Sequence, residues 1–192
     1  MESLTIKESE EYLRQISTKI EKGDDQVAKY IEILEEYCNT HSCFAMAGVQ
    51  LGIPKRIVYI KHTDPESIKT EDVGFAMINP IILNRKGKTE YWEACMSGLD
   101  NVALVERPYT IVVRYETPEG EEKEVTFDGF PSTVISHELD HLDGIFHMDR
   151  AKKLLVMTRE ERVAFRKENK YNIISKDCEF TYPPLKKVSN PN

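Results

Sequence analysis

Two histidines and a glutamate lie within five residues of one another, at His137, Glu138 and His141 in the segment HELDH. On a helix, residues four apart lie on one face, so both imidazoles can bind one metal ion. Glu138 is placed to accept a proton from an attacking water without being a ligand itself. The alternative is a coincidental match on a solvated helix. The apolar neighbours oppose it, because buried histidines and acids need partners and a metal ion provides one.

A catalytic metal of this kind usually has three protein ligands and one open position. Two residues compete for the third place. His147 follows His141 by six residues, and HELDHLDGIFH fits the longer pattern of zinc endopeptidases. Cys95, in the segment EACMS, is the other candidate. Without a metal role, His147 is expected to be a partly exposed imidazole and Cys95 an inert buried thiol. Spacing alone leaves the choice open.

Helical periodicity predicts the elements that surround these residues. Residues 25–40 have apolar side chains at helical spacing, which predicts an amphipathic helix, and residues 8–20 predict a shorter one. Pro131 is expected to open the helix that carries the histidines, which runs to about Asp143 and ends at Gly144. Thr158 and Glu161 form a capping-box pattern, which predicts a charged C-terminal helix.

The middle of the chain is typical of β-strands that follow one another without intervening helices. Asn79-Pro80 and residues 85–87 are predicted as turns between strands. The fold class is therefore predicted as α+β, with mainly antiparallel β-sheets packed around a central HExxH-bearing helix, an N-terminal amphipathic helix and a C-terminal helix. The predicted strands are residues 56–60, 75–83, 88–94, 102–106, 110–116 and 123–127.

Length and charge limit the domain organisation and the partners. The chain has 192 residues, which suits one domain over 1–192 with irregular tails at about 1–7 and 175–192. Its 33 acidic and 26 basic residues give a net charge of −7, which opposes DNA binding and an anionic membrane surface. The sequence contains no apolar run of the ~18–20 residues that a membrane span needs.

Four irregularly spaced cysteines and an acidic N-terminus without a secretory pattern favour the reducing cytoplasm. An organelle is the alternative, if a targeting segment has been removed. In a reducing compartment a thiol is expected to be a metal ligand or a core residue, not half of a disulfide.

Three segments together resemble the peptide deformylase family. They are CFAMAGVQ (43–50), EACMS (93–97) and HELDH (137–141). These segments are similar, in the same order, to the family's G-x-G-x-A-A-x-Q, E-G-C-x-S and H-E-x-D-H segments. The connecting sequence, such as VERPYTIVVRYETPEGE, is also similar, and the resemblance runs from about residue 13 to 150.

The resemblance implies that Cys95, His137 and His141 are the metal ligands. The usual ion of the family is Fe²⁺, with Zn²⁺, Ni²⁺ or Co²⁺ as substitutes. Glu138 would be the general acid and base. A thiolate and two imidazoles leave a tetrahedral site with one open position, which agrees with this assignment.

Further roles also follow from the resemblance. The side chain of Gln50 and the backbone N–H of Met96 would stabilise the oxyanion, as preorganised donors do in acyl transfer. Glu93 would be a carboxylate behind the metal ligands, paired with Arg107. The residues implied to border the substrate are Ala45, Glu93 and Ala94.

The implied activity is metal-dependent removal of the formyl group from the N-terminal formyl-methionine of newly synthesised polypeptides. The implied partners are N-formyl-methionyl peptides of nascent chains, and the charged segment 152–170 is a candidate for docking on the ribosome. Ala45 and Ala94 stand where the family usually has glycine, and Gly48 stands where it usually has alanine. The methyl group of Ala45 is expected to narrow the pocket or alter its peptide preference.

Two alternatives compete with this interpretation. The first is a zinc endopeptidase with a three-histidine site of His137, His141 and His147. The second is a catalytically weak, deformylase-like protein that binds peptides without turning them over. The alanines at glycine positions favour this second alternative slightly, whereas the intact ligand and base residues oppose it.

Overall fold

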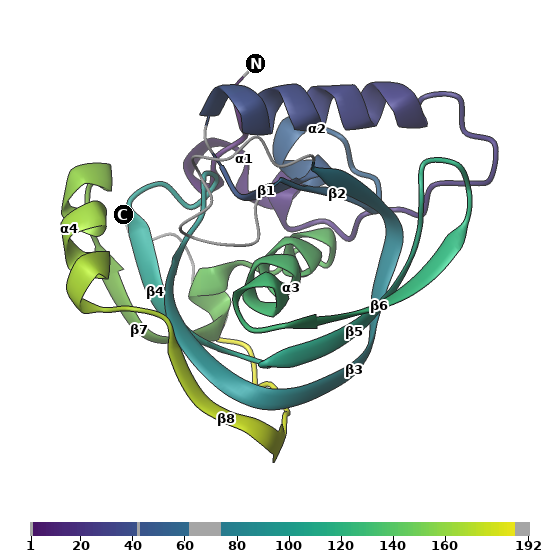
Figure 1. The fold of residues 1–192 in the computed structure, drawn as a ribbon. Helices are drawn as coiled ribbons and strands as arrows, with labels where there is room; N and C mark the ends of the chain where they lie inside the picture. The colour runs from purple at the N-terminus through teal and green to yellow at the C-terminus, as the bar shows by residue number, and fades with distance from the viewer. Residues whose placement is uncertain (1, 42, 62–73, 187–192) are drawn as a thin grey trace.

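An eight-stranded sheet curves around one central helix, α3 (Phe130–Leu142), in the computed structural model, which describes residues 2–41, 43–61 and 74–186 (Figure 1). This architecture confirms the predicted α+β class. The other helices are α1 (Ile6–Leu13), α2 (Val27–His41) and α4 (Arg159–Glu168). The strands are β1 (Ala45–Ala47), β2 (Ile57–Ile60), β3 (Phe75–Ala94), β4 (Asn101–Arg107), β5 (Thr110–Glu116), β6 (Glu122–Asp128), β7 (Ala151–Val156) and β8 (Asn172–Glu179).

The strands of the sheet pair antiparallel, as the sequence predicts. Their main order is β1-β2-β3-β4-β7. Strand β5 pairs with β3 and β6, and β8 also pairs with β3. Strand β3 therefore contacts four other strands, which its length of 20 residues allows. The C-terminal end of β3 leads directly into Cys95.

The turns predicted at Asn79-Pro80 and at residues 85–87 are wrong, because β3 runs through both. Asn79 adopts a positive φ of 51°, and its side chain bonds both the N–H and the C=O of Ile20, at 2.9 Å each. The pairing with β5 shifts register just after this point, where Pro80 has no N–H to donate. Gly87 lies at a second register shift, against β8. The turn-forming residues at these two places therefore introduce irregularities into one long strand instead of ending it.

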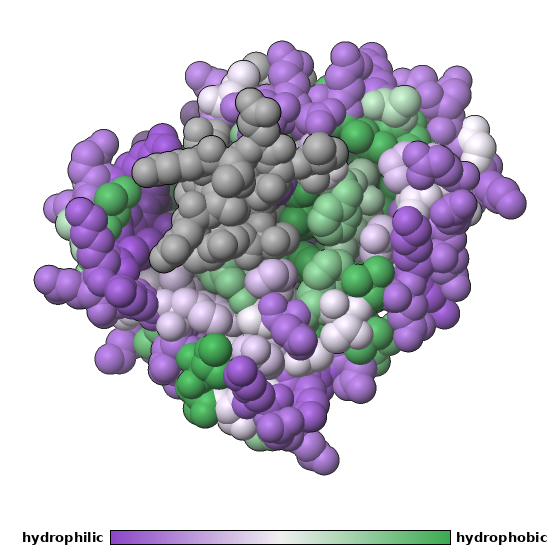
Figure 2. Space-filling model, viewed as in Figure 1, coloured by the Kyte–Doolittle hydropathy of each residue, from purple (hydrophilic) through white to green (hydrophobic). Residues whose placement is uncertain are grey.

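Helix α3 is almost entirely buried inside the curve of the sheet (Figure 1). It begins near Pro131 and is followed by Gly144, whose φ of +69° ends the helix as predicted. The larger of two hydrophobic clusters packs around it, with Ile135 and Leu142 fully buried. The space-filling view shows hydrophobic residues near the centre of one face, inside a rim of hydrophilic ones (Figure 2).

The N-terminal helix is shorter than the expected 8–20. Helix α1 spans Ile6–Leu13, and the chain then bonds to other segments: the N–H of Ser17 donates to the C=O of Leu142, at 2.8 Å. Helix α2 and the capping box of α4 agree with the prediction; Thr158 and Glu161 exchange hydrogen bonds of 2.8 and 3.3 Å. In the described part of the chain, none of the helices is long and apolar enough to cross a membrane.

The irregular tails predicted at about 1–7 and 175–192 are also wrong in part. Ile6 begins α1 and is buried, and residues 175–179 belong to β8. Strand β8 was not expected because its charged sequence has little apolar alternation. It pairs with an edge of β3 that would otherwise expose unpaired backbone groups. Met1 and residues 187–192 lie outside the described residues, and β1 and β7 were not predicted.

Gly144→Ala is expected to destabilise the protein strongly. A Cβ at this position would lie 2.1 Å from the backbone oxygen of Arg14, in addition to the positive φ. Gly120→Ala is the matched control, because Gly120 has a φ of +84° but an added Cβ meets nothing within 4 Å. We expect urea unfolding to show a loss of about 1 kcal/mol for Gly120→Ala and about 3–5 kcal/mol for Gly144→Ala. Equal losses would show that the contact with Arg14 does not restrict this position.

Candidate active site

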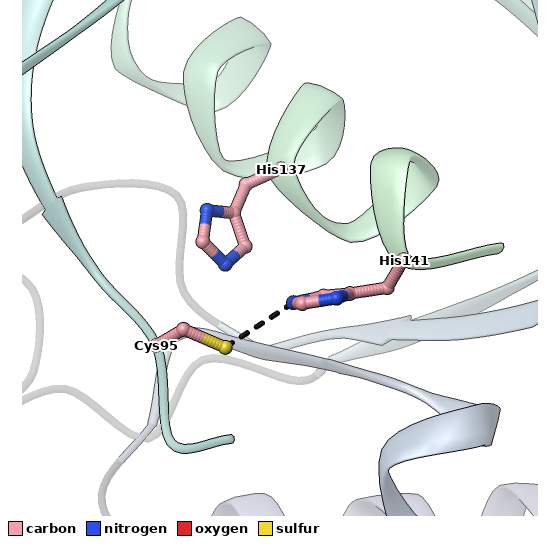
Figure 3. A group of neighbouring side chains, drawn as sticks. All are labelled: Cys95, His137 and His141. Carbon is pink, nitrogen blue, oxygen red and sulfur yellow. Dashed lines mark hydrogen bonds between the residues drawn. The ribbon is translucent and has the colours of Figure 1, made fainter. Parts of the chain in front are cut away.

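Helix α3 and the end of β3 bring three potential metal ligands together (Figure 3). His137 and His141 point from one face of the helix toward Cys95. The Cys95 Sγ lies 3.2 Å from the Nε2 of His141, and one ligand atom from each of the three residues lies within 4.8 Å of the others. Soft thiolate and imidazole donors at this separation suit one transition-metal ion. The three residues therefore fit a metal ion by both geometry and donor type.

The orientation of His137 is set by Glu93. The Nδ1 of His137 donates to a carboxylate oxygen of Glu93 at 2.8 Å, which leaves Nε2 free to face Cys95. Metal-binding histidines usually hold a carboxylate in this way. Burial opposes charge on His137, but the bonds to Cys95 and Glu93 raise its pKa well above the ordinary value. Burial lowers the pKa of His141, which keeps that imidazole neutral.

A buried arginine holds Glu93 in place. Arg107, at the end of β4, is fully buried and donates to both carboxylate oxygens of Glu93, at 2.8 and 2.9 Å. It also bonds to Asp140 of α3. Although burial works against the charged form of Glu93, the Arg107 guanidinium and His137 hold the pKa of that carboxyl well below its usual range. The predicted Glu93–Arg107 pair is present in the structure.

Gln50 lies in a short 3-10 turn, Gly48–Leu51, directly after β1. Its Oε1 accepts a hydrogen bond from the N–H of Ala47 at 3.0 Å, which fixes the direction of the amide. Its Nε2 donates to the Cys95 Sγ at 3.3 Å and to the Oγ of Ser97 at 3.1 Å. The N–H groups of this side chain therefore point at the centre of the site.

Glu138 is buried beside the three potential ligands. Its Oε2 has no hydrogen-bond partner among the described residues. Burial raises the pKa of Glu138 to about 7, against the opposing effect of the His137 charge. A carboxyl group with a pKa near neutrality can both accept and return a proton.

Gln50, Cys95, His137 and Glu138 line a cleft with a volume of about 460 Å³. Met96 borders the cleft and is 41% exposed. The three residues expected at the substrate also line it: Ala45, Glu93 and Ala94. Tyr91, Phe130 and Val134 supply an apolar wall.

The structure places Cys95, not His147, with the histidine pair. His147 is buried, contrary to the expectation of a partly exposed imidazole, and its ring centroid lies 5.6 Å from that of His137. Its Nε2 bonds to the backbone oxygen of Asn101 at 3.1 Å, and the ring does not belong to the group of potential ligands. The chain turns back after Gly144 because Phe146 and Met148 enter the core.

Sequence reasoning missed the outer members of the buried charge network. Asp140 accepts hydrogen bonds from Arg107 and also two from Arg150, at 2.7 Å each. Arg150 in turn lies over the ring of Tyr182, at 3.7 Å from its centroid. The only signal for this network in the sequence was Asp140, the second acidic residue of HELDH. Arg150 lies ten residues after Asp140, but no spacing rule joins the two, and Tyr182 lies much further along the chain.

The fold and the site together define a metal-dependent hydrolase built on an α+β sheet around a helix. The family model described as polypeptide deformylase matches residues 4–156, more than half of the chain. The chain therefore belongs to the polypeptide deformylase family. Its function is the hydrolytic deformylation of peptides, and neither the endopeptidase nor the non-catalytic alternative is supported.

Several relatives carry the same name. The peptide deformylase of Rhizobium meliloti is 34% identical over 143 residues, which covers 74% of this chain and 80% of the relative. That of Finegoldia magna is 34% identical over 155 residues, covering 80% and 90% of the two chains. Solved structures agree: a probable peptide deformylase from Synechococcus phage S-SSM7 superposes with a TM-score of 0.69 at 28% identity, covering 78% of this chain and 99% of the phage protein.

The third ligand can be tested by metal analysis of two variants. Cys95→Ala is expected to lose or severely weaken metal binding, because two histidines on one helix cannot complete a three-ligand site. His147→Ala is expected to retain stoichiometric metal, since its ring bonds to Asn101. In cobalt-loaded protein, a thiolate-to-metal charge-transfer band in the near ultraviolet should be present and depend on Cys95. Loss of metal in His147→Ala with full occupancy in Cys95→Ala would contradict this assignment.

Proposed function

We propose that residues 1–192 form a single metallohydrolase domain in which Cys95, His137 and His141 hold one divalent ion. In this proposal Glu138 moves the proton while the formyl group is removed from N-formyl-methionyl peptides. The observation that carries the proposal is the convergence of the three potential ligands within 4.8 Å, beside a buried carboxylate with one oxygen that has no partner in the described part of the chain.

The proton transfers in this mechanism belong to Glu138. When bound, the ion would act as a Lewis acid that activates water and polarises the formyl carbonyl. Glu138 accepts the proton of the attacking water and then delivers it to the nitrogen of the methionine as the carbon–nitrogen bond breaks. A pKa of about 7, raised by burial, supports both steps near neutral pH. The products are formate and a peptide with a free amino terminus.

Two donors are proposed to stabilise the negative oxygen that forms during attack. The first is the amide of Gln50, which already points at Cys95. The second is the backbone N–H of Met96, which follows Cys95 at the accessible side of the cleft. Donors held in position before the reaction stabilise developing charge without reorganising. The bond from Ala47 to Gln50 supports this role because it fixes the amide.

The peptide is proposed to enter along the side of the cleft formed by Ala45, Glu93 and Ala94. A peptide deformylase from Acinetobacter baumannii, with a TM-score of 0.69 and 25% identity over 78% of this chain and 97% of that one, has been solved bound to Met-Ala-Ser. By similarity, we expect this cleft to accept a methionine at the N-terminal position. The apolar wall that includes Tyr91 and Phe130 would contact its side chain.

We further propose Fe²⁺ as the ion, with Zn²⁺, Ni²⁺ or Co²⁺ as functional substitutes, because one thiolate and two imidazoles suit each of these metals. Nascent chains in the cytoplasm would be the source of formylated peptides, which would bring this protein near the ribosome. The free state of the four cysteines supports a reducing compartment.

Anaerobic release of formate from a formyl-methionyl peptide by iron-loaded protein tests the proposed function. Glu138→Gln retains the size of the side chain but removes the proton acceptor. We expect normal metal content and a loss of turnover of about 10²–10⁴-fold. Glu32→Gln, on the exposed face of α2, is the control and should have the parental rate. A metal-loaded Glu138→Gln protein with the parental rate would exclude Glu138 as the base.

A further inference from the structure

Three arginines of α4 form a row along the mouth of the cleft. Arg159, Arg162 and Arg166 are separated by three and four residues, which places them on one face of the helix. All three line the same cleft as Cys95 and Glu138. Helix α4 follows the end of the region that the family model matches, which is residues 4–156. The row therefore belongs to a part of this chain to which the family assignment gives no role.

Helix α4 is fixed against the rim of the cleft by contacts with the backbone of the site. Arg166 donates two hydrogen bonds to the carbonyl oxygen of Trp92, at 2.9 and 3.2 Å. Arg162 donates to the carbonyl oxygen of Leu99 at 3.3 Å, and the ring of Phe165 packs edge-on against Trp92 at 5.1 Å. These contacts hold the row next to the strand that leads into Cys95. They use few of the five N–H donors on each guanidinium.

The positive charge of the row is not neutralised by a salt bridge. Within the described residues, the ion pairs involve other basic side chains, and no carboxylate lies within 4.0 Å of Arg159, Arg162 or Arg166. Burial, together with the charge of Arg166 and Arg159, lowers the pKa of Arg162, against the opposing effect of the Asp100 and Glu160 carboxylates. A guanidinium remains charged in proteins, so Arg162 is a partly buried cation beside two other cations, and a further anion at the row would be stabilised.

The substrate can supply such an anion beyond its first residue. The formyl group must reach Cys95 and Glu138 on the floor of the cleft, so the following residues leave across its rim. A formylated N-terminus has no charge. The first charges on a peptide substrate are therefore those of the side chains after the methionine, or of a terminal carboxylate in a short peptide.

We propose that Arg159 and Arg162, supported by Arg166, bind a carboxylate of the substrate at the first or second residue after the formyl-methionine, and so favour acidic N-terminal sequences. This inference rests on the proposed function and names its substrate class. Arginine binds carboxylates through paired N–H donors, which gives direction as well as charge. The row gathers three positive charges on a protein whose net charge is −7.

The test compares formyl-Met-Ala-Glu-Ala, formyl-Met-Ala-Gln-Ala and formyl-Met-Ala-Lys-Ala, all with amidated C-termini, on iron-loaded protein. A second set moves the varied residue next to the methionine. We expect kcat/KM for the Glu peptide to exceed that for the Gln peptide by about two- to fivefold, the range for exposed charge pairs, with the Lys peptide lowest. The preference should weaken as salt concentration rises. The Gln peptide as a free acid shows whether a terminal carboxylate can serve instead.

The double variant Arg159→Gln/Arg162→Gln is expected to remove the difference between the Glu and Gln peptides. Lys167→Gln is the matched control: it removes one charge from the same helix at a residue that does not line the cleft, and it should keep the parental preference. A wild-type protein that processes all three peptides equally would overturn the inference. So would a double variant that retains the preference.

Failure of the proposed function would have a different signature, because no peptide would release formate. Binding of the Glu and Gln peptides by calorimetry then decides the inference separately: tighter binding of the Glu peptide supports it, and equal affinity overturns it. A short RNA oligonucleotide serves as a competitor. If RNA inhibits a wild-type protein that does not distinguish the peptides, the inference is overturned and the row is reassigned to phosphate binding.

Discussion

The interaction between Arg107 and two carboxylates connects the two elements that carry the potential metal ligands, β3 and α3, to β4. Its guanidinium extends from the end of β4, bonds both oxygens of Glu93 on β3, and reaches Asp140 on α3. A buried charge without partners is strongly unfavourable, whereas paired charges restrict one another to a single geometry. Glu93 then directs His137, and β3 positions Cys95 two residues later. The relative placement of the three potential ligands therefore depends on one fully buried cation.

The same network reaches the C-terminal part of the chain. Arg150 bonds Asp140 and stacks on Tyr182, which follows β8. Strand β8 covers an edge of β3, and α4 borders the cleft through Trp92. Tyr182 and β8, which follow the matched family region, therefore contact the residues and the strand that hold the metal ligands. Helix α4, which also follows that region, borders the cleft. The floor of the cleft carries the proposed chemistry, and α4 lies at its rim.

Local patterns in the sequence predicted the features that local physics controls. The spacing of HELDH placed two histidines on one helix face, and the capping box of Thr158 and Glu161 started α4 where expected. Long-range contacts decided the rest. Asn79-Pro80 has the composition of a turn, but bonds to Ile20 and the pairing with β5 keep it inside β3. Strand β8, the burial of His147 and the Arg107–Asp140 bond depend on segments far apart in sequence, and no periodicity encodes them.

The metal affinity of Arg107→Met is the most direct test of this account, measured by competition with a chelator on folded protein. Methionine fills a similar apolar volume but leaves Glu93 and Asp140 without their shared cation. We expect affinity to fall about 10- to 100-fold, as is typical when the partners of metal ligands are lost. Arg56→Met, which removes a more exposed pair with Asp143, should retain the parental affinity. Parental metal affinity in Arg107→Met would contradict the claim that this buried arginine positions the site.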